Sequence, residues 1–225
     1  MGDRKQVTEY LQELIRKANP RAKRILELGC GTGSVLKHLA ANYDVWGLDL
    51  SKKMLSLAKR KVPQARLSHQ DMVRFRLPGH FDAIFCVYDS INHVLDFRRW
   101  KQLFANVSQH LTERGVFIFD INTQRKLDRH IAEPAWVQEF GGNLLIMKVT
   151  ARPKKASNWN IKVFEQAAGT RYCLHEENIQ EVSFPVHDIV AALRPHFRYV
   201  QVIDTDRKRP SLSSERLYFV CEKFS

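Results

Sequence analysis

Apolar residues along the first half of the chain follow two alternating spacings. One spacing, of three and four residues, is typical of amphipathic helices, and the other is the short continuous run of a buried strand. The pattern predicts helices over residues 7–18, 34–43, 52–61 and 97–111, and strands over residues 24–28, 44–50, 65–69, 81–87 and 115–120. Helices that alternate with apolar strands are typical of a parallel sheet covered on both faces.

The rhythm changes after residue 122. Four extended segments, over residues 136–140, 144–150, 159–165 and 171–181, are separated by Gly-Gly, Pro-Lys-Lys and Ala-Gly turns, which predicts antiparallel strands. The earlier rhythm then returns, with a helix over residues 185–193 and strands over residues 199–204 and 217–223. We therefore expect an α/β fold, a Rossmann-like, doubly wound, mostly parallel seven-stranded sheet with an antiparallel strand insertion. Residues 1–122 and 182–225 would form this domain, and residues 123–181 the insertion.

Composition adds few constraints. The chain has 225 residues, 44% of them hydrophobic, and four cysteines, none in a C-x-x-C pair. This cysteine usage predicts reduced thiols and no bound metal. No segment approaches the roughly 18 apolar residues of a membrane span, and no export signal is visible, so we expect a cytoplasmic protein without membrane contact.

The net charge of +12 is compatible with a polyanionic partner such as nucleic acid. The basic residues are spread along the chain, and the densest runs, at residues 21–24, 59–61 and 207–209, are short. Solvated surface is the favoured interpretation of such runs, so a nucleic-acid partner is not favoured.

A glycine turn follows the first predicted strand. Gly29, Gly31 and Gly33 are spaced G-x-G-x-G before a helix, where backbone amides can approach a nucleotide-like ligand. Position 34 is Ser, so the last glycine of a dinucleotide fingerprint is absent. Glu27 places a carboxylate just before the turn, which suits a cationic ligand, and Asp49 ends the second strand, where it can accept from both ribose hydroxyls.

The segments ELGCGTG, GLDLS and QDM resemble those of class I S-adenosylmethionine-dependent methyltransferases. The likeness covers residues 22–122, and the final strand pair resembles the last hairpin of that family. It implies that S-adenosylmethionine is the cofactor, with Asp49 at its ribose and Asp71 and Met72 beside its adenine. The full set of implied cofactor-binding residues is Glu27, Gly29, Cys30, Gly31, Gly33, Asp49, Leu50, Met54, Asp71, Met72, Val87 and Tyr88.

Methyl transfer from a sulfonium is an in-line displacement that depends mainly on positioning, and a general base can assist it. The polar segment after the fourth strand contains Asp89 and His93, which we take as candidate catalytic residues, with His93 as the first candidate base. A hydrogen-bonded histidine that caps the next helix is an equal alternative for His93. In the insertion, His175 is the third candidate, as a lid residue near the acceptor.

The resemblance favours a small-molecule acceptor methylated on N or O. The segment after the fourth strand lacks the Asp/Asn-Pro-Pro-aromatic motif of amino-methyltransferases acting on nucleic-acid bases, and no cysteine follows a proline as in cytosine-C5 enzymes. Inserted strands at this position form lids or acceptor pockets in the family's small-molecule enzymes. An RNA methyltransferase is the alternative, and a cofactor-binding module without catalysis is a third hypothesis. We expect a monomer or a homodimer.

Overall fold

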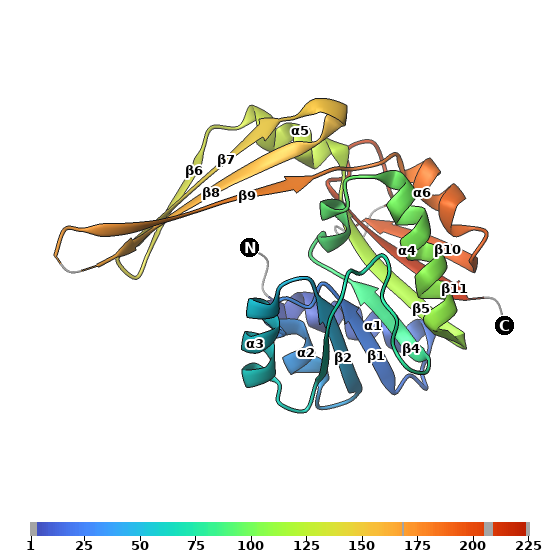
Figure 1. The fold of residues 1–225 in the computed structure, drawn as a ribbon. Helices are drawn as coiled ribbons and strands as arrows, with labels where there is room; N and C mark the ends of the chain where they lie inside the picture. Colours follow the sequence, from blue (N-terminus) through green and yellow to red (C-terminus); the bar gives the residue numbers. More distant parts are fainter. Residues whose placement is uncertain (1–3, 168, 205–208, 224–225) are drawn as a thin grey trace.

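The computed structural model describes residues 4–167, 169–204 and 209–223, and its centre is a seven-stranded sheet (Figure 1). The strand order is β10-β11-β5-β4-β1-β2-β3. The strands are β1 (Arg24–Leu28), β2 (Asp44–Asp49), β3 (Arg66–His69), β4 (Phe81–Cys86), β5 (Leu111–Asn122), β10 (Phe197–Asp204) and β11 (Arg216–Lys223). β1 to β5 are parallel, whereas β11 pairs antiparallel with both β5 and β10. The predicted fold class is confirmed.

Helices cover both faces of this sheet, as its apolar strands require. One face packs against α1 (Arg4–Ala18), α2 (Ser34–Leu39) and α3 (Lys52–Lys61), and the other against α4 (Phe97–His110) and α6 (Val186–Leu193). Alternation along β5 supplies both layers, because Phe117 and Phe119 lie in the α4 core while Val116 and Ile118 lie in the α1 core.

The insertion is a second, separate sheet that extends away from the domain as a long arm (Figure 1). Its strands β6 (Trp136–Phe140), β7 (Asn143–Ala151), β8 (Ser157–Gln166) and β9 (Tyr172–Glu181) are all antiparallel and follow the chain order. Both edge strands of the arm are largely exposed. A short 3-10 turn, η2 (Pro153–Lys155), joins β7 to β8.

The largest differences between the structure and the sequence expectations, of four residues or more, concern three elements. The second helix ends at Leu39, and β5 begins at Leu111, four residues before the expected start, because its pairing with β4 continues past an irregularity between Phe81 and Ala83. Helix α5 (Gln124–Ala132) was not predicted at all. Leu127 is its one buried residue, so its polar sequence QRKLDRHIA hides the helical period.

The cysteines are free thiols, buried at Cys30, Cys86 and Cys221 and exposed at Cys173. Among the residues that the structure describes, no helix is both long and apolar enough to cross a membrane.

Candidate functional site

The glycine turn has the backbone conformation that only glycine adopts without strain. Gly29, Gly31 and Gly33 all have positive φ, at 70°, 52° and 71°. A Cβ at Gly29 would lie 3.2 Å from the Ser90 Cβ and 3.3 Å from the Met72 Cε, so this glycine is packed under neighbouring loops. A Cβ at Gly31 would meet no atom of the described residues within 4 Å. The turn is therefore packed against neighbouring loops at Gly29 and open at Gly31.

Asp49, at the end of β2, holds this turn in place. Its Oδ2 accepts from the Gly31 N–H at 2.8 Å, and its Oδ1 accepts from the Ser51 N–H at 2.8 Å. A carboxylate has about four lone-pair sites, so the predicted ribose hydrogen bonds remain available in addition to these two. Asp49 thus couples the shape of the glycine turn to whatever binds above it.

The residues beside the turn differ in exposure. Glu27 is 4% exposed, and Cys30 is buried, with its N–H donating to the Leu48 carbonyl at 2.9 Å. Burial raises the pKa of the Cys30 thiol far above its usual range, so this residue is a neutral packing group. Leu50 and Met54, by contrast, expose their apolar side chains at the sheet edge. Exposed apolar groups there suit contact with a ring system of a ligand.

Asp71 and Met72 follow β3, as predicted. Asp71 accepts from the Val73 N–H at 2.9 Å through Oδ1, and its Oδ2 contacts the Arg99 guanidinium of α4. Sequence analysis missed Arg99, because nothing in the chain pattern links that helix to the third strand. The ion pair orders the loop whose Met72 side chain packs on the glycine turn.

Two consecutive non-glycine residues after β4 have a left-handed backbone conformation. Val87 is buried, and Tyr88 and Asp89 have φ of 59° and 52°. Such a conformation in non-glycine residues costs about 1–3 kcal/mol each and persists only where the surroundings enforce it. The 3-10 helix η1 (Ser90–His93) follows directly.

A buried ion network enforces this conformation. The Arg216 guanidinium, from β11, contacts the carboxylates of Asp89 and Asp120, and the Asp89 N–H donates to Asp120 Oδ1 at 3.2 Å. Asp120 is fully buried, and burial raises its pKa to about 6 despite the arginine. Asp120 lies at the same edge of the sheet as Asp49, so a search for acidic residues at the carboxyl ends of the predicted strands could have identified it.

His93 and Glu181 bring the base of the arm to this edge. His93 Nδ1 donates to the Gln180 carbonyl at 3.1 Å, which leaves Nε2 as the acceptor of the neutral ring. Glu181 is 5% exposed, and its Oε2 accepts from Asn122 Nδ2 at 3.0 Å. Burial, and then the charge of Asp89, raise the pKa of Glu181 to about 7. No sequence pattern pointed to Glu181 or Arg216, because each reaches the site from a distant part of the chain.

The structure does not bring His175 to this edge. It lies on β9 six residues before Glu181, which corresponds to roughly 20 Å along an extended strand. There its Nε2 pairs with Glu165 Oε2 at 2.8 Å, and the side chain is exposed. Of the three candidate catalytic residues, the structure therefore unites Asp89 and His93 only.

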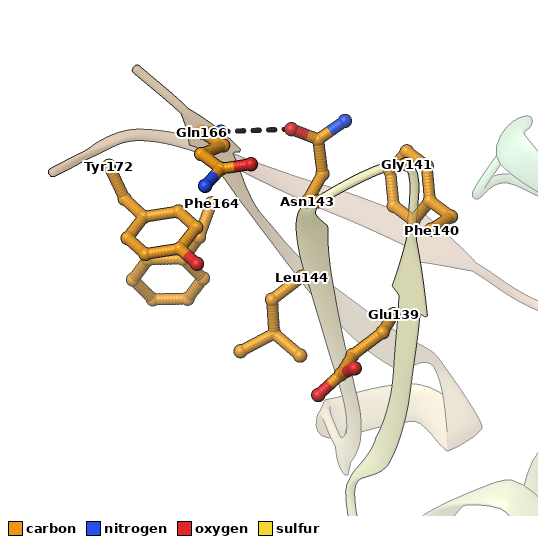
Figure 2. A pocket seen from close by; sticks show the side chains of 9 residues that line it. Glu139, Phe140, Gly141, Asn143, Leu144, Phe164, Gln166 and Tyr172 are labelled. Carbon is orange, nitrogen blue, oxygen red and sulfur yellow. Dashed lines mark hydrogen bonds between the residues drawn. The ribbon is translucent and has the colours of Figure 1, made fainter. Parts of the chain in front are cut away.

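A hollow at the far end of the arm is separate from this edge. Figure 2 shows the rings of Phe164 and Tyr172 on one side of it and Glu139 on another, with Leu144 between them. The backbone N–H of Gln166 donates to the Asn143 side-chain oxygen at 2.9 Å, which ties β8 to the β6–β7 turn. No group of the glycine turn lines this hollow, so it lies outside the candidate site.

The glycine turn fits S-adenosylmethionine. Gly31 is open to an approaching ligand, and Glu27 places a buried carboxyl group just before the turn, which suits a cationic ligand. When bound, the cofactor supplies an activated methyl group. The residues of this chain contribute the shape of the turn and acceptors at Asp49 and Asp71.

Comparison with known proteins agrees with this geometry. Residues 25–115 match the model of a methyltransferase domain. The chain is 36% identical over 111 residues to dTDP-3-amino-3,6-dideoxy-alpha-D-glucopyranose N,N-dimethyltransferase from Streptomyces fradiae, a match that covers 49% of this chain and 44% of that protein. It is 28% identical over 219 residues to the putative methyltransferase YqeM from Bacillus subtilis (strain 168), covering 93% and 87% of the two chains.

Solved structures extend the likeness to the whole fold. An S-adenosylmethionine-dependent methyltransferase from Clostridium acetobutylicum ATCC 824 superposes with a TM-score of 0.90 at 27% identity, over 99% of this chain and 93% of that one. The sugar N-methyltransferase KedS8 from Streptoalloteichus sp ATCC 53650 has the same fold, with a TM-score of 0.82 at 24% identity over 100% and 89% of the two chains. The chain contains a methyltransferase domain and has the fold of the class I S-adenosylmethionine-dependent methyltransferases.

Proposed function

We propose that the chain transfers a methyl group from S-adenosylmethionine to a nitrogen or oxygen atom of a small-molecule acceptor. The observation that carries this proposal is the attachment of the arm to the carboxyl edge of the sheet. The Val182 N–H donates to the Asn92 carbonyl at 3.0 Å, and Asn92 Nδ2 donates to the Val182 carbonyl at 2.7 Å. The base of the arm is thereby fixed beside Asp89 and His93.

This attachment supplies a second wall. The sheet edge by itself offers one side of a pocket, whereas alignment of an acceptor and exclusion of water require two. We infer that residues 123–181 act as a lid or acceptor pocket, with His93 as a candidate base and Asp89 as a residue that shapes the turn. Relatives such as the Streptomyces fradiae enzyme are N,N-dimethyltransferases of dTDP-linked amino sugars, which supports a small acceptor.

The basic runs give little support to RNA as the acceptor. The Arg24 guanidinium lies 4.3 Å from the centre of the Trp46 ring, and Lys59 Nζ donates to the Pro63 carbonyl at 2.6 Å. Lys61 Nζ donates to the hydroxyls of Thr32 and Ser34. Residues 207 and 208 of the third run lie outside the described residues. Three cations of the first two runs, Arg24, Lys59 and Lys61, therefore make local contacts within the domain.

A turnover assay tests the proposal. The protein is incubated with S-adenosylmethionine and a panel of small amines and alcohols, including nucleotide-linked amino sugars, and S-adenosylhomocysteine is measured. We expect formation of S-adenosylhomocysteine that depends on the acceptor. Turnover of structured RNA, together with none of any small acceptor, would contradict the proposal.

The same proposal places the protein in a reducing cytoplasm, which is supported by its four free cysteines.

A further inference from the structure

Glu181 is a buried carboxylate beside the candidate catalytic residues Asp89 and His93. It ends β9 at the base of the arm, and its Oε1 accepts no hydrogen bond from any residue that the structure describes, whereas Oε2 is held by Asn122. Ligand atoms of Asp89, His93 and Glu181 all lie within 4.8 Å of one another. Asn122 thus holds one oxygen of Glu181 and leaves the other for a ligand between these three side chains.

Carboxylates outnumber the lysine and arginine cations around Glu181. Three carboxylates meet there, from Asp89, Asp120 and Glu181, and the fixed cations beside them are Arg216 and Lys126. Burial lowers the pKa of Lys126, because desolvation disfavours its charged form. An excess negative charge in a buried site is costly unless a partner offsets it. A ligand with one positive charge would supply that offset.

The neighbouring charge of Arg216 favours an organic cation over a divalent metal ion at this position. The Arg216 guanidinium already contacts Asp89, so a divalent ion between the three side chains would approach a fixed positive charge. An ammonium group, in contrast, donates hydrogen bonds in several directions and brings a single charge.

Building on the proposed function, we propose that Glu181 binds the protonated amino group of an amine acceptor and removes its proton, so that the chain methylates nitrogen. The ammonium gives its proton to the Glu181 carboxylate, which leaves a neutral amine and a neutral carboxylic acid. The amine lone pair then forms the new N–C bond while the C–S bond of the sulfonium breaks. The pair of electrons of that bond remains on sulfur, and the product is the methylated ammonium ion.

The first test needs no substrate. If Glu181 binds a cationic ligand, its ionised carboxylate destabilises the folded protein when no ligand is bound. Glu181→Gln removes this cost, so it should raise the Tm by several degrees at pH 8, where the carboxylate is ionised, and change the Tm little at pH 5. Glu113→Gln, which replaces an exposed carboxylate near the start of β5, is the control and should leave the Tm unchanged at both pH values. A Glu181→Gln protein that is no more stable than the wild type at pH 8 would overturn the proposal, because the carboxylate would then be structural.

The second test uses paired acceptors, each a primary amine and its hydroxyl counterpart, with EDTA present. We expect turnover of amines only, a loss of at least 100-fold in kcat/KM for Glu181→Gln at pH 7, and a smaller loss at high pH, where the free amine no longer needs a base. Turnover confined to hydroxyl compounds, an amine reaction unaffected by Glu181→Gln, or activity abolished by EDTA and restored by Mg²⁺ would each overturn it. Calorimetry with S-adenosylhomocysteine separates the two proposals, because a failure to bind would contradict the proposed function itself, whereas intact binding with these results contradicts only the role of Glu181.

Discussion

Asn92 and Asn122 form a reciprocal buried pair. Asn92 Nδ2 donates to the Asn122 carbonyl at 2.9 Å, and the Asn122 N–H donates to Asn92 Oδ1 at 3.1 Å. Asn92 also holds Val182, so one side chain joins the segment after β4, the end of β5 and the end of the arm. This fully buried amide is therefore one of the groups that fix the base of the arm, together with the His93–Gln180 and Asn122–Glu181 hydrogen bonds.

Replacing that amide should loosen the junction. We expect Asn92→Ala to lower the free energy of unfolding by about 2–4 kcal/mol, since it leaves buried backbone groups at Asn122 and Val182 without partners. Urea unfolding measures the change, and hydrogen exchange should show faster exchange of the Val182 amide. A loss below about 0.5 kcal/mol would mean that water replaces the side chain.

Asp49→Ala should weaken the binding of S-adenosylhomocysteine by roughly 1.5–3 kcal/mol, the range for hydrogen bonds to a charged group. The structure adds a second cause, because the same carboxylate orders the N–H groups of Gly31 and Ser51. Calorimetry on the folded variant measures the effect, with NADH as a ligand that should bind neither protein. An unchanged Kd would remove Asp49 from the ribose site.

Gly47 lies on β2 beneath the glycine turn, and a Cβ there would sit 2.7 Å from Leu36 Cδ1 and 2.9 Å from Cys30 Sγ. Gly47→Ala should therefore destabilise the fold by about 1–3 kcal/mol through overpacking. It should also weaken S-adenosylhomocysteine binding, because Cys30 belongs to the turn. Thermal unfolding and calorimetry report the two effects, and a variant as stable as the wild type would show that the turn tolerates a shift.

Arg216→Met should have a strong dependence on pH. Without the guanidinium, the pKa of the buried Asp120 carboxyl rises further above its unfolded value, so the folded state binds the proton more tightly than the unfolded chain. Stability is then lost as the pH rises through the folded pKa. We expect a loss of about 3–5 kcal/mol at pH 8, the range for a broken buried pair, and a clearly smaller loss at pH 5. Equal losses at both values would contradict the assigned role of Asp120.

Replacing residues 123–181 with a short linker should leave cofactor binding largely intact and abolish methyl transfer. Asn122 and Val182 both bond to Asn92, so the two ends of the cut lie close together. The glycine turn, Asp49 and Asp71 all precede the cut. Titration with S-adenosylhomocysteine is the control for folding, and full turnover by the truncated protein would contradict the role of the arm as a second wall.

The features of the molecule that could be predicted are those that a short segment of sequence determines. The G-x-G-x-G spacing and the acid at Asp49 sit on one strand–turn–helix unit and the next strand end, and the structure connects them as expected. Glu181 and Arg216 could not be found in this way. Glu181 follows three antiparallel strands and Arg216 begins the last strand, so their meeting with Asp89 depends on how the sheets join, which no short segment encodes.

His175 is the converse case, a residue that the sequence suggested and that lies away from the sheet edge. The residue type was reasonable for a base, but strand β9 is ten residues long and extends away from the sheet, so only its last residues reach the edge. Helix α5 was missed because its charged sequence packs through one leucine. The length and direction of β9 decided the first outcome, and the hidden helical period of α5 decided the second.

Cys173 gives the arm a natural attachment point for a spectroscopic label. It is exposed near the far end of β9, whereas Cys30, Cys86 and Cys221 are buried, and burial raises the pKa of each of those three thiols. Because the thiolate is the reactive form, a maleimide dye at neutral pH should modify Cys173 alone in the native protein. The unmutated chain can thus carry a single fluorophore on the arm, and energy transfer from its own tryptophans would follow the arm as ligands bind.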